Sequence, residues 1–284
     1  MDLRPFDAEL LAAYLRHLGL ERAPGTPSPA DLTELHHAQL DRVPYENLEI
    51  QLGRPTGIDP HESARRILTG RGGYCYHLNG SFAGLLVSLG YDVTLARGAV
   101  PAAGADGRWW GNHLVVLVRF GTETWVADVG MGDGFRDPVP LVEGSVYQLP
   151  FRYRLRHVGG PLWRFHHDVT ATTEGYDLDV TPVGLASYAA MHTFLSTSPE
   201  SGFVQKLVVQ RRHHAHTLTL RGCVLTRADA DGKSARDVEK ESEWLDLLGG
   251  EFGLRLDGFA PGALSALWIR VRTTHEAWVR AGRP

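Results

Sequence analysis

Residues 71–100, RGGYCYHLNGSFAGLLVSLGYDVTLARGAV, contain the point at which the chain changes from helical to strand periodicity. Apolar side chains between Phe82 and Leu89 are spaced as on one face of a helix, and Gly90 is suited to end it. From Tyr91 onward, the β-branched and aromatic content is typical of a strand. The stretch therefore divides a helical part of the chain from a part rich in strands.

The sequence on either side extends this division. Before it, Asp7, Ser28 and Asp59 are each suited to cap a helix, and a proline follows Ser28 and Asp59 directly. After it, we expect strands in segments 91–100, 113–120, 123–129, 151–158, 162–170 and 176–180, two further strands in 207–226 that are broken near the histidines, and helices in 234–252 and 261–280. The expected order is helices first, then an antiparallel sheet or barrel, then a C-terminal part with both strands and helices. This order predicts an α+β protein with a helical N-terminal block.

The overall composition is that of an ordinary globular protein. The 284 residues are 43% hydrophobic and carry a net charge of −4, so no basic excess favours a nucleic acid or an anionic membrane as partner. Two cysteines, Cys75 and Cys223, are too few for a disulfide framework and indicate a reducing compartment. No apolar run is long enough to cross a bilayer. We therefore expect a cytoplasmic protein.

Cys75 is the first candidate for chemistry. It lies at the start of the helix predicted after Gly72 and Gly73, where unpaired backbone N–H groups and the helix dipole favour a thiolate. The two glycines let the backbone turn sharply and approach a ligand closely. The alternative is a small buried cysteine without reactivity.

A nucleophilic cysteine needs a base, and the base needs a group that orients it. His113 begins one apolar strand, and Asp128 ends the next strand along the chain. If these strands form a hairpin, both side chains come near the same end of the sheet. A buried carboxylate needs a partner, which a protonated histidine would supply. The alternative is a turn aspartate and an exposed histidine.

Three further motifs give weaker signals. The loop 130–134, GMGDG, is not followed by a helix and so lacks the context of a dinucleotide-binding fingerprint, although its backbone could approach a ligand. The segment 213–216, HHAH, lacks further identifiable ligands, so we expect a solvated strand there and no metal. We expect Cys223 in the core, and the charged residues of 227–243 on a solvated face with a loop.

Six segments together resemble the arylamine N-acetyltransferase family, and they occur in the family's order. They are HHAQLDRVPYENLEI (36–50), RGGYCYHLN (71–79), GYDVTLARGAV (90–100), NHLVVLV (112–118), WVADVGMG (125–132) and FLSTSPESGF (194–203). The resemblance implies a helical bundle at 1–90 that carries the nucleophile, a β-barrel at 91–200 that carries the histidine and aspartate, and an α/β lid at 201–284. It also implies a cysteine-protease-like core.

The resemblance implies that Cys75, His113 and Asp128 form a catalytic triad, the same three residues reached above. Cys75 would take an acetyl group from acetyl-CoA as a thioester and pass it, in a ping-pong reaction, to an arylamine, hydrazine or hydroxylamine. The family's substrate-binding positions fall on Tyr45, Tyr76, Val100, Asn112, Gly130, Met131 and Phe203. The partners would be coenzyme A and a small amine, without nucleic acid or membrane, and the protein would be a monomer or homodimer.

This chain departs from the family's common pattern at three positions. His77 stands in place of a glutamate beside the nucleophile, and Tyr45 and Met131 each stand in place of a phenylalanine in the pocket. The change at His77 alters an ionic contact, such as one with Arg71, and adds a group that can titrate near neutrality. The alternatives are an amide synthase that closes a macrolactam from a carrier-bound acyl chain, a thiol hydrolase with the same triad, and a non-catalytic binding module.

Overall fold

The computed structural model describes residues 3–20, 25–101 and 109–283. The part before the first long strand consists of α1 (Ala8–His17), α2 (Pro29–Arg42), β1 (Tyr45–Glu46), α3 (Leu48–Gln51), α4 (Pro60–Leu68) and α5 (Cys75–Ser88). The side chains of Asp7, Ser28 and Asp59 accept hydrogen bonds from the first turns of α1, α2 and α4, so the three predicted caps are confirmed.

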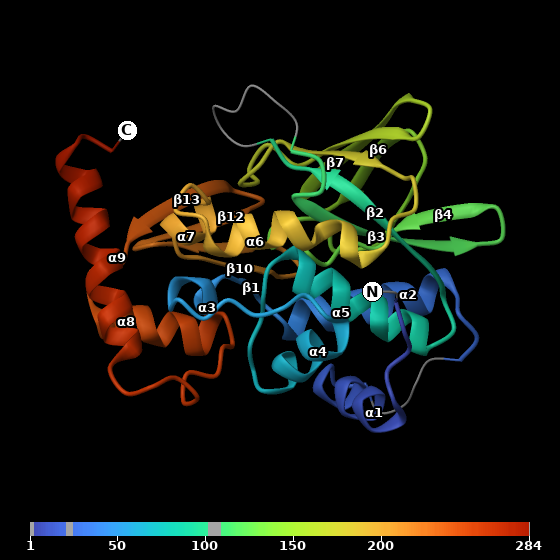
Figure 1. Ribbon diagram of the computed structural model, residues 1–284. Coiled ribbons are helices and arrows are strands. Elements are labelled where there is room, and N and C mark those ends of the chain that lie inside the picture. The colour runs from blue at the N-terminus through green and yellow to red at the C-terminus, as the bar shows by residue number, and fades with distance from the viewer. Residues whose placement is uncertain (1–2, 21–24, 102–108, 284) are drawn as a thin grey trace.

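The middle of the chain forms an eight-stranded antiparallel sheet that curls into a nearly closed barrel (Figure 1). Its strands are β2 (Asp92–Ala99), β3 (His113–Phe120), β4 (Glu123–Val126), β5 (Val139–Pro140), β6 (Gly144–Gln148), β7 (Phe151–Gly159), β8 (Leu162–His166) and β9 (Gly175–Asp179). Their order in the sheet is β5-β4-β3-β2-β9-β8-β7-β6. In β7, Phe151, Tyr153 and Leu155 are buried while the residues between them are exposed, so the barrel is filled by alternate side chains.

The C-terminal part contains a second antiparallel sheet and the remaining helices. The strands β10 (Val208–Arg212), β11 (Thr217–Arg221), β12 (Val224–Asp229) and β13 (Gly232–Asp237) follow β1 in the order β1-β10-β11-β12-β13. The helical elements are η1 (Leu185–Tyr188), α6 (Ala189–Thr197), α7 (Gly202–Gln205), α8 (Glu241–Asp246), the π-helical turn η2 (Leu247–Glu251) and α9 (Ala263–Arg280). Because β1 pairs with β10, the helical block and the C-terminal sheet are joined directly.

Three predicted segments are partly wrong. Residues 234–237 form part of β13, paired with β12, and the helix begins only at Glu241; strand pairing therefore outweighs the local charge pattern. The strand expected at 162–170 ends at His166, because the side chain of Asp168 bonds the N–H of Thr170 in a turn. The histidine-rich segment 213–216 is the hairpin turn between β10 and β11, so the predicted break between two strands is confirmed and the solvated strand at the histidines is wrong.

Three clusters of buried apolar side chains fill the molecule. The first lies among α1, α2, α4 and α5 and includes Leu95 of β2 and Leu114 of β3; the second lies between the five-stranded sheet and the C-terminal helices; the third is inside the barrel. We propose the division at 1–90, 91–200 and 201–284 on this basis. The likeness of the core to cysteine proteases stays a prediction.

The helices give one further result. Within residues 3–20, 25–101 and 109–283, none of them is both long enough and apolar enough to span a membrane. The cytoplasmic location stays a prediction.

Candidate active site

Cys75 is the first residue of α5, so its thiol lies at the positive end of that helix, as the sequence predicts. Tyr74 is the N-cap in an extended conformation. Two glycines let other backbone segments approach this turn. A Cβ at Gly72 would lie 2.1 Å from the carbonyl oxygen of Pro44, and one at Gly130 would lie 2.9 Å from the Cβ of Cys75. Any larger residue at either position would therefore displace the segment around the thiol.

His113 and Asp128 meet through the β3–β4 hairpin. The backbone N–H of Ala127 donates to Val116, which continues the pairing beyond β4 and brings Asp128 level with the start of β3. The Nε2 atom of His113 lies 2.6 Å from Oδ2 of Asp128, and each residue is 1% exposed. The predicted hairpin is confirmed, and it excludes water from the pair.

The pair is held in its charged form. Burial lowers the pKa of His113, but the charge of Asp128 and hydrogen bonds to Asp128 and Cys75 outweigh it and raise that pKa to about 10. Burial likewise raises the pKa of Asp128, while His113, Asn79 and the N–H of Gly130 bring it below the ordinary value. Near neutral pH the site therefore contains an imidazolium and a carboxylate.

Two residues that the sequence did not single out complete this arrangement. The Nδ2 group of Asn79 donates to Oδ1 of Asp128 at 2.7 Å. Asn79 follows Cys75 by four residues, so helical spacing could have placed it on the same face of α5. The ring of Tyr176, in β9, lies 4.9 Å from the ring of His113, and burial together with the charge of Asp128 raises the pKa of its hydroxyl. No local pattern points to Tyr176, because the sheet order alone brings β9 to the site.

Three of the seven expected substrate-binding positions, Asn112, Gly130 and Tyr45, interact with Cys75, and a fourth, Phe203, contacts one of them. The Sγ atom of Cys75 lies 3.7 Å from the carbonyl oxygen of Asn112. Gly130 also packs against Cys75. Tyr45 interacts electrostatically with Cys75 and makes an edge contact with Phe203 at a ring separation of 6.4 Å. These residues come from four different parts of the chain.

The other three expected positions are Val100 and Tyr76, which bond residues near the site, and Met131, which follows Gly130 in the chain. Val100 exchanges two hydrogen bonds with the side chain of Asn112, at 2.8 Å and 3.0 Å. Tyr76 is fully buried and its hydroxyl donates to the carbonyl of Gly111. Met131 is 9% exposed and packs with the barrel core. In this structure, the hydroxyl of Tyr76 therefore already has a partner.

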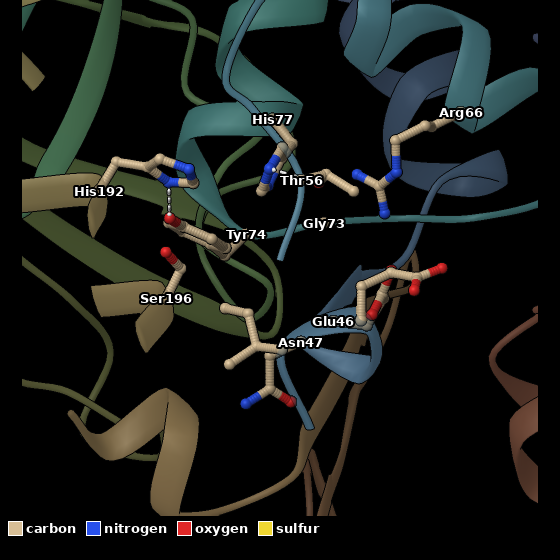
Figure 2. A pocket seen from close by; sticks show the side chains of 11 residues that line it. Glu46, Asn47, Thr56, Arg66, Gly73, Tyr74, His77, His192 and Ser196 are labelled. Carbon is tan, nitrogen blue, oxygen red and sulfur yellow. Dashed lines mark hydrogen bonds between the residues drawn. The ribbon is translucent and has the colours of Figure 1, made fainter. Parts of the chain in front are cut away.

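His77, two residues after Cys75 in α5, lines a small pocket (Figure 2). Its Nε2 atom is 3.2 Å from the hydroxyl of Thr56, while its Nδ1 atom has no partner among the described residues. The guanidinium of Arg66 lines the same pocket, with Nη1 also unpartnered among those residues. Arg71 instead lies 3.8 Å above the ring of Phe259. The cation that acts on His77 is therefore Arg66 and not Arg71.

The environment of His77 predicts a dependence of stability on pH. Burial, together with the charge of Arg66, lowers its pKa to about 3. The unfolded chain takes up this proton below the ordinary pKa of 6.5 and the folded chain does not, so stability is full above 6.5 and falls as the pH drops below it. Between pH 7 and pH 5, the wild type should lose about 2 kcal/mol more than His77→Gln, which does not titrate.

Urea unfolding of both proteins at the two pH values measures this difference. The exposed His157, changed to Gln, is the matched control and should follow the wild type. Equal pH slopes for wild type and His77→Gln would show that His77 does not contribute to the loss.

The structure also shows where the other cysteine and the histidine-rich segment lie. Cys223 is 1% exposed and belongs to the core beneath the second sheet, as expected. The rings of His213 and His216 stack at 4.3 Å within their turn. Across the part of the chain that the structure describes, no three histidine, cysteine or carboxylate side chains are grouped to hold a metal ion.

The fold and the site together define a class of protein. An α+β chain with a nearly closed barrel holds a cysteine at a helix start against a buried histidine–aspartate pair. A family model described as N-acetyltransferase matches residues 30–260. The chain is therefore an enzyme of the acyltransferase class.

Similarity to known proteins identifies the family within the acyltransferase class. The chain is 30% identical over 280 residues to the arylamine N-acetyltransferase / N-hydroxyarylamine O-acetyltransferase of Salmonella typhimurium, covering 94% of this chain and 98% of the relative. It is 29% identical over 266 residues to the arylamine N-acetyltransferase of Mycolicibacterium smegmatis, covering 88% and 94%. The structure of Mycobacterium marinum arylamine N-acetyltransferase in complex with CoA matches with a TM-score of 0.83 and 26% identity, covering 92% and 99%. This chain belongs to the arylamine N-acetyltransferase family, as its motifs predict.

Proposed function

We propose that the protein transfers an acetyl group from acetyl-CoA to an arylamine, hydrazine or hydroxylamine through a thioester on Cys75. The observation that carries this proposal is the buried ion pair of His113 and Asp128, 2.6 Å apart, beside a cysteine at the positive end of a helix. The relatives named arylamine N-acetyltransferases, one of them with CoA, support the choice of acceptor and donor.

In the first step, the sulfur of Cys75 attacks the carbonyl carbon of the acetyl thioester. As the new C–S bond forms, the bond between that carbon and the CoA sulfur breaks, and protonated His113 gives its proton to the leaving sulfur. The N–H of Cys75, at the helix start, is suited to stabilise the oxyanion that forms between the two events. Because one thioester replaces another, the loading of Cys75 is readily reversible.

In the second step, the amine nitrogen attacks the acetyl carbonyl on Cys75. His113 takes the proton from nitrogen as the C–S bond breaks, which frees the sulfur of Cys75 and restores the imidazolium. The nitrogen must be neutral to attack, and this favours anilines and hydrazines over alkylamines at pH 7. We propose the seven expected positions as substrate-binding residues: Tyr45, Tyr76, Val100, Asn112, Gly130, Met131 and Phe203.

We propose that the phosphates of the donor bind in a groove of about 580 Å³ between α7 and α9. No carboxylate is among the described residues that line it, whereas four cations are: Lys206, Arg221, Lys233 and Arg270. Charge-assisted hydrogen bonds from such side chains are the usual means of binding phosphate. The groove begins next to Phe203, the residue that contacts Tyr45 beside the thiol.

Removal of two groove cations predicts a donor-specific defect. The double variant Arg221→Ala/Lys233→Ala should raise KM for acetyl-CoA by about tenfold or more, because two charge-assisted contacts to phosphate are lost. Its rate with p-nitrophenyl acetate, a donor without phosphate, should be unchanged. Steady-state kinetics with both donors measures the effect.

The matched control removes a cation from the barrel surface. Arg156→Ala, at an exposed position of β7, should leave both KM values as in the wild type. An unchanged KM for acetyl-CoA in the double variant, or an equal defect with both donors, would contradict the assignment of phosphates to this groove.

Mass spectrometry of the intact protein tests the proposed function as a whole. Brief mixing with acetyl-CoA should add one acetyl group, and subsequent addition of an aniline or hydrazine should remove it while the N-acetyl product forms. Discharge at the same rate without amine would instead indicate a hydrolase. Loading only by a carrier-bound acyl chain would indicate an amide synthase.

A further inference from the structure

We propose that His192 is a positioning residue for the acylation reaction: by accepting the hydroxyl hydrogen of Tyr74, it fixes the peptide group that joins Tyr74 to Cys75. The N–H of that peptide is the donor at the start of α5, so His192 acts on the reacting centre without touching it. This inference rests on the proposed function, in which the acetyl group is carried by Cys75.

The contact is direct and lies between distant segments (Figure 2). His192 is in α6, and its Nδ1 atom is 2.5 Å from the hydroxyl of Tyr74, which is 118 residues away. The two rings are nearly parallel, with centroids 6.1 Å apart and an interplanar angle of 19°. Tyr74 itself is 1% exposed. Its side chain is therefore enclosed, with the hydroxyl bound to one partner.

Other rings restrict Tyr74 from further directions. His77 meets its face edge-on at 4.7 Å, and Phe203 lies at 4.9 Å with an interplanar angle of 44°. His77 comes from α5 and Phe203 from α7. The ring of Tyr74 is thus held between the nucleophile's helix and two helices of the segment that follows the barrel. A shift of its hydroxyl would require movement of the whole side chain.

Such movement would reach Cys75 through the main chain. The carbonyl oxygen of Tyr74 accepts the N–H groups of His77 at 2.9 Å and Leu78 at 3.1 Å, so it forms the first bonds of α5. The same planar peptide carries the N–H of Cys75, and neither end of it can rotate alone. An oxyanion donor is effective only when it is aimed at the position where negative charge develops. The side-chain bond to His192 therefore limits rotation of a catalytic donor.

The bond imposes a requirement on the protonation of His192. Nδ1 accepts a hydrogen bond only when it carries no proton, so the imidazole must be neutral with its hydrogen on Nε2. Burial lowers the pKa of His192, which favours that form at neutral pH. The titratable and charged groups facing this region from neighbouring elements are Glu46, Glu49, Glu62, Arg66, Tyr74, Tyr76 and His77. The bond should therefore be present at pH 7 and lost when His192 takes up a proton in acid.

Four variants separate this role from a merely structural one. Tyr74→Phe and His192→Leu each remove the same hydrogen bond. The double variant lacks that one bond and loses no other, so it tests whether the two side chains act together. His192→Asn places a carboxamide oxygen where Nδ1 stands and cannot titrate. The acylation rate is measured as the burst of p-nitrophenolate from p-nitrophenyl acetate, which does not depend on the phosphate groove. Alkylation by iodoacetamide is measured in parallel, because it needs the thiolate but no oxyanion donor.

We expect Tyr74→Phe and His192→Leu each to slow acylation by about tenfold, which is less than the effect of losing an oxyanion donor outright. The double variant should be no slower than either single variant. His192→Asn should be within about twofold of the wild type at pH 7, with the acid limb of its pH profile at lower pH. Alkylation rates should be equal in all variants. An Asn variant as slow as the Leu variant, multiplied losses in the double variant, or an equal fall in alkylation would overturn the proposal. A wild type that no donor acylates would overturn the proposed function itself.

Discussion

Replacement of Cys75 by alanine should lower acetyl transfer by a factor on the order of 10⁵ or more, because no other group in the site can form the thioester. The variant should not gain an acetyl group on mixing with acetyl-CoA, as measured by mass spectrometry of the intact protein. Its fold should persist, since a small side chain is shortened by one atom at a position that alanine's helix propensity suits. The free energy of unfolding should change by about 1 kcal/mol or less.

The second cysteine is the matched control. Cys223 is buried in the core of the second sheet, and Cys223→Ala should still accept one acetyl group. An adduct that survives in Cys75→Ala, or disappears in Cys223→Ala, would refute the assignment of the nucleophile.

Replacement of Asp128 by asparagine should slow acylation by about 10³–10⁴-fold. The shape of the side chain is kept, but the charge that holds His113 as an imidazolium is lost. With that charge removed, burial dominates, and the pKa of His113 should fall from about 10 to below its ordinary value of 6.5. Alkylation of Cys75 by iodoacetamide should then require a higher pH than in the wild type. NMR titration of the histidine and the pH dependence of alkylation measure the two consequences.

A second buried aspartate on the same loop provides the control. Asp133 is 4% exposed and accepts the N–H of Thr172 at 2.6 Å. Asp133→Asn should leave the pH at which Cys75 is alkylated as in the wild type. If Asp133→Asn and Asp128→Asn had the same kinetic defect, a general disturbance of the loop would explain both and the role given to Asp128 would fail.

The core of the site could be predicted because its determinants are local in sequence. A helix start after two glycines places Cys75, and two consecutive apolar strands place His113 and Asp128 at one end of a hairpin. Hairpin pairing and helix dipoles depend on neighbouring residues, which a single sequence displays directly. The pairing of His113 with Asp128 and the position of Cys75 at a helix start were therefore accessible before any tertiary structure.

The parts that were not predicted depend on contacts between distant segments. Tyr176 lies against His113 and near the charge of Asp128 only because β9 lies beside β2 in the barrel, and no pattern around residue 176 shows this. Residues 234–237 of β13 fall within a predicted helix, yet their backbone pairs with β12. Edge strands are fixed by the hydrogen bonds a neighbour offers, so their own composition indicates them poorly.

The sequence by itself determined the α+β class, the three capped helices, the hairpin that joins His113 to Asp128, and the family to which the chain belongs. Only the tertiary structure decided that Arg66 rather than Arg71 accompanies His77, that β1 joins the C-terminal sheet, and that His192 binds Tyr74. The reason is physical. Local periodicity and capping follow from bonds within a few residues, whereas partners on different helices and strands are selected by packing of the whole chain.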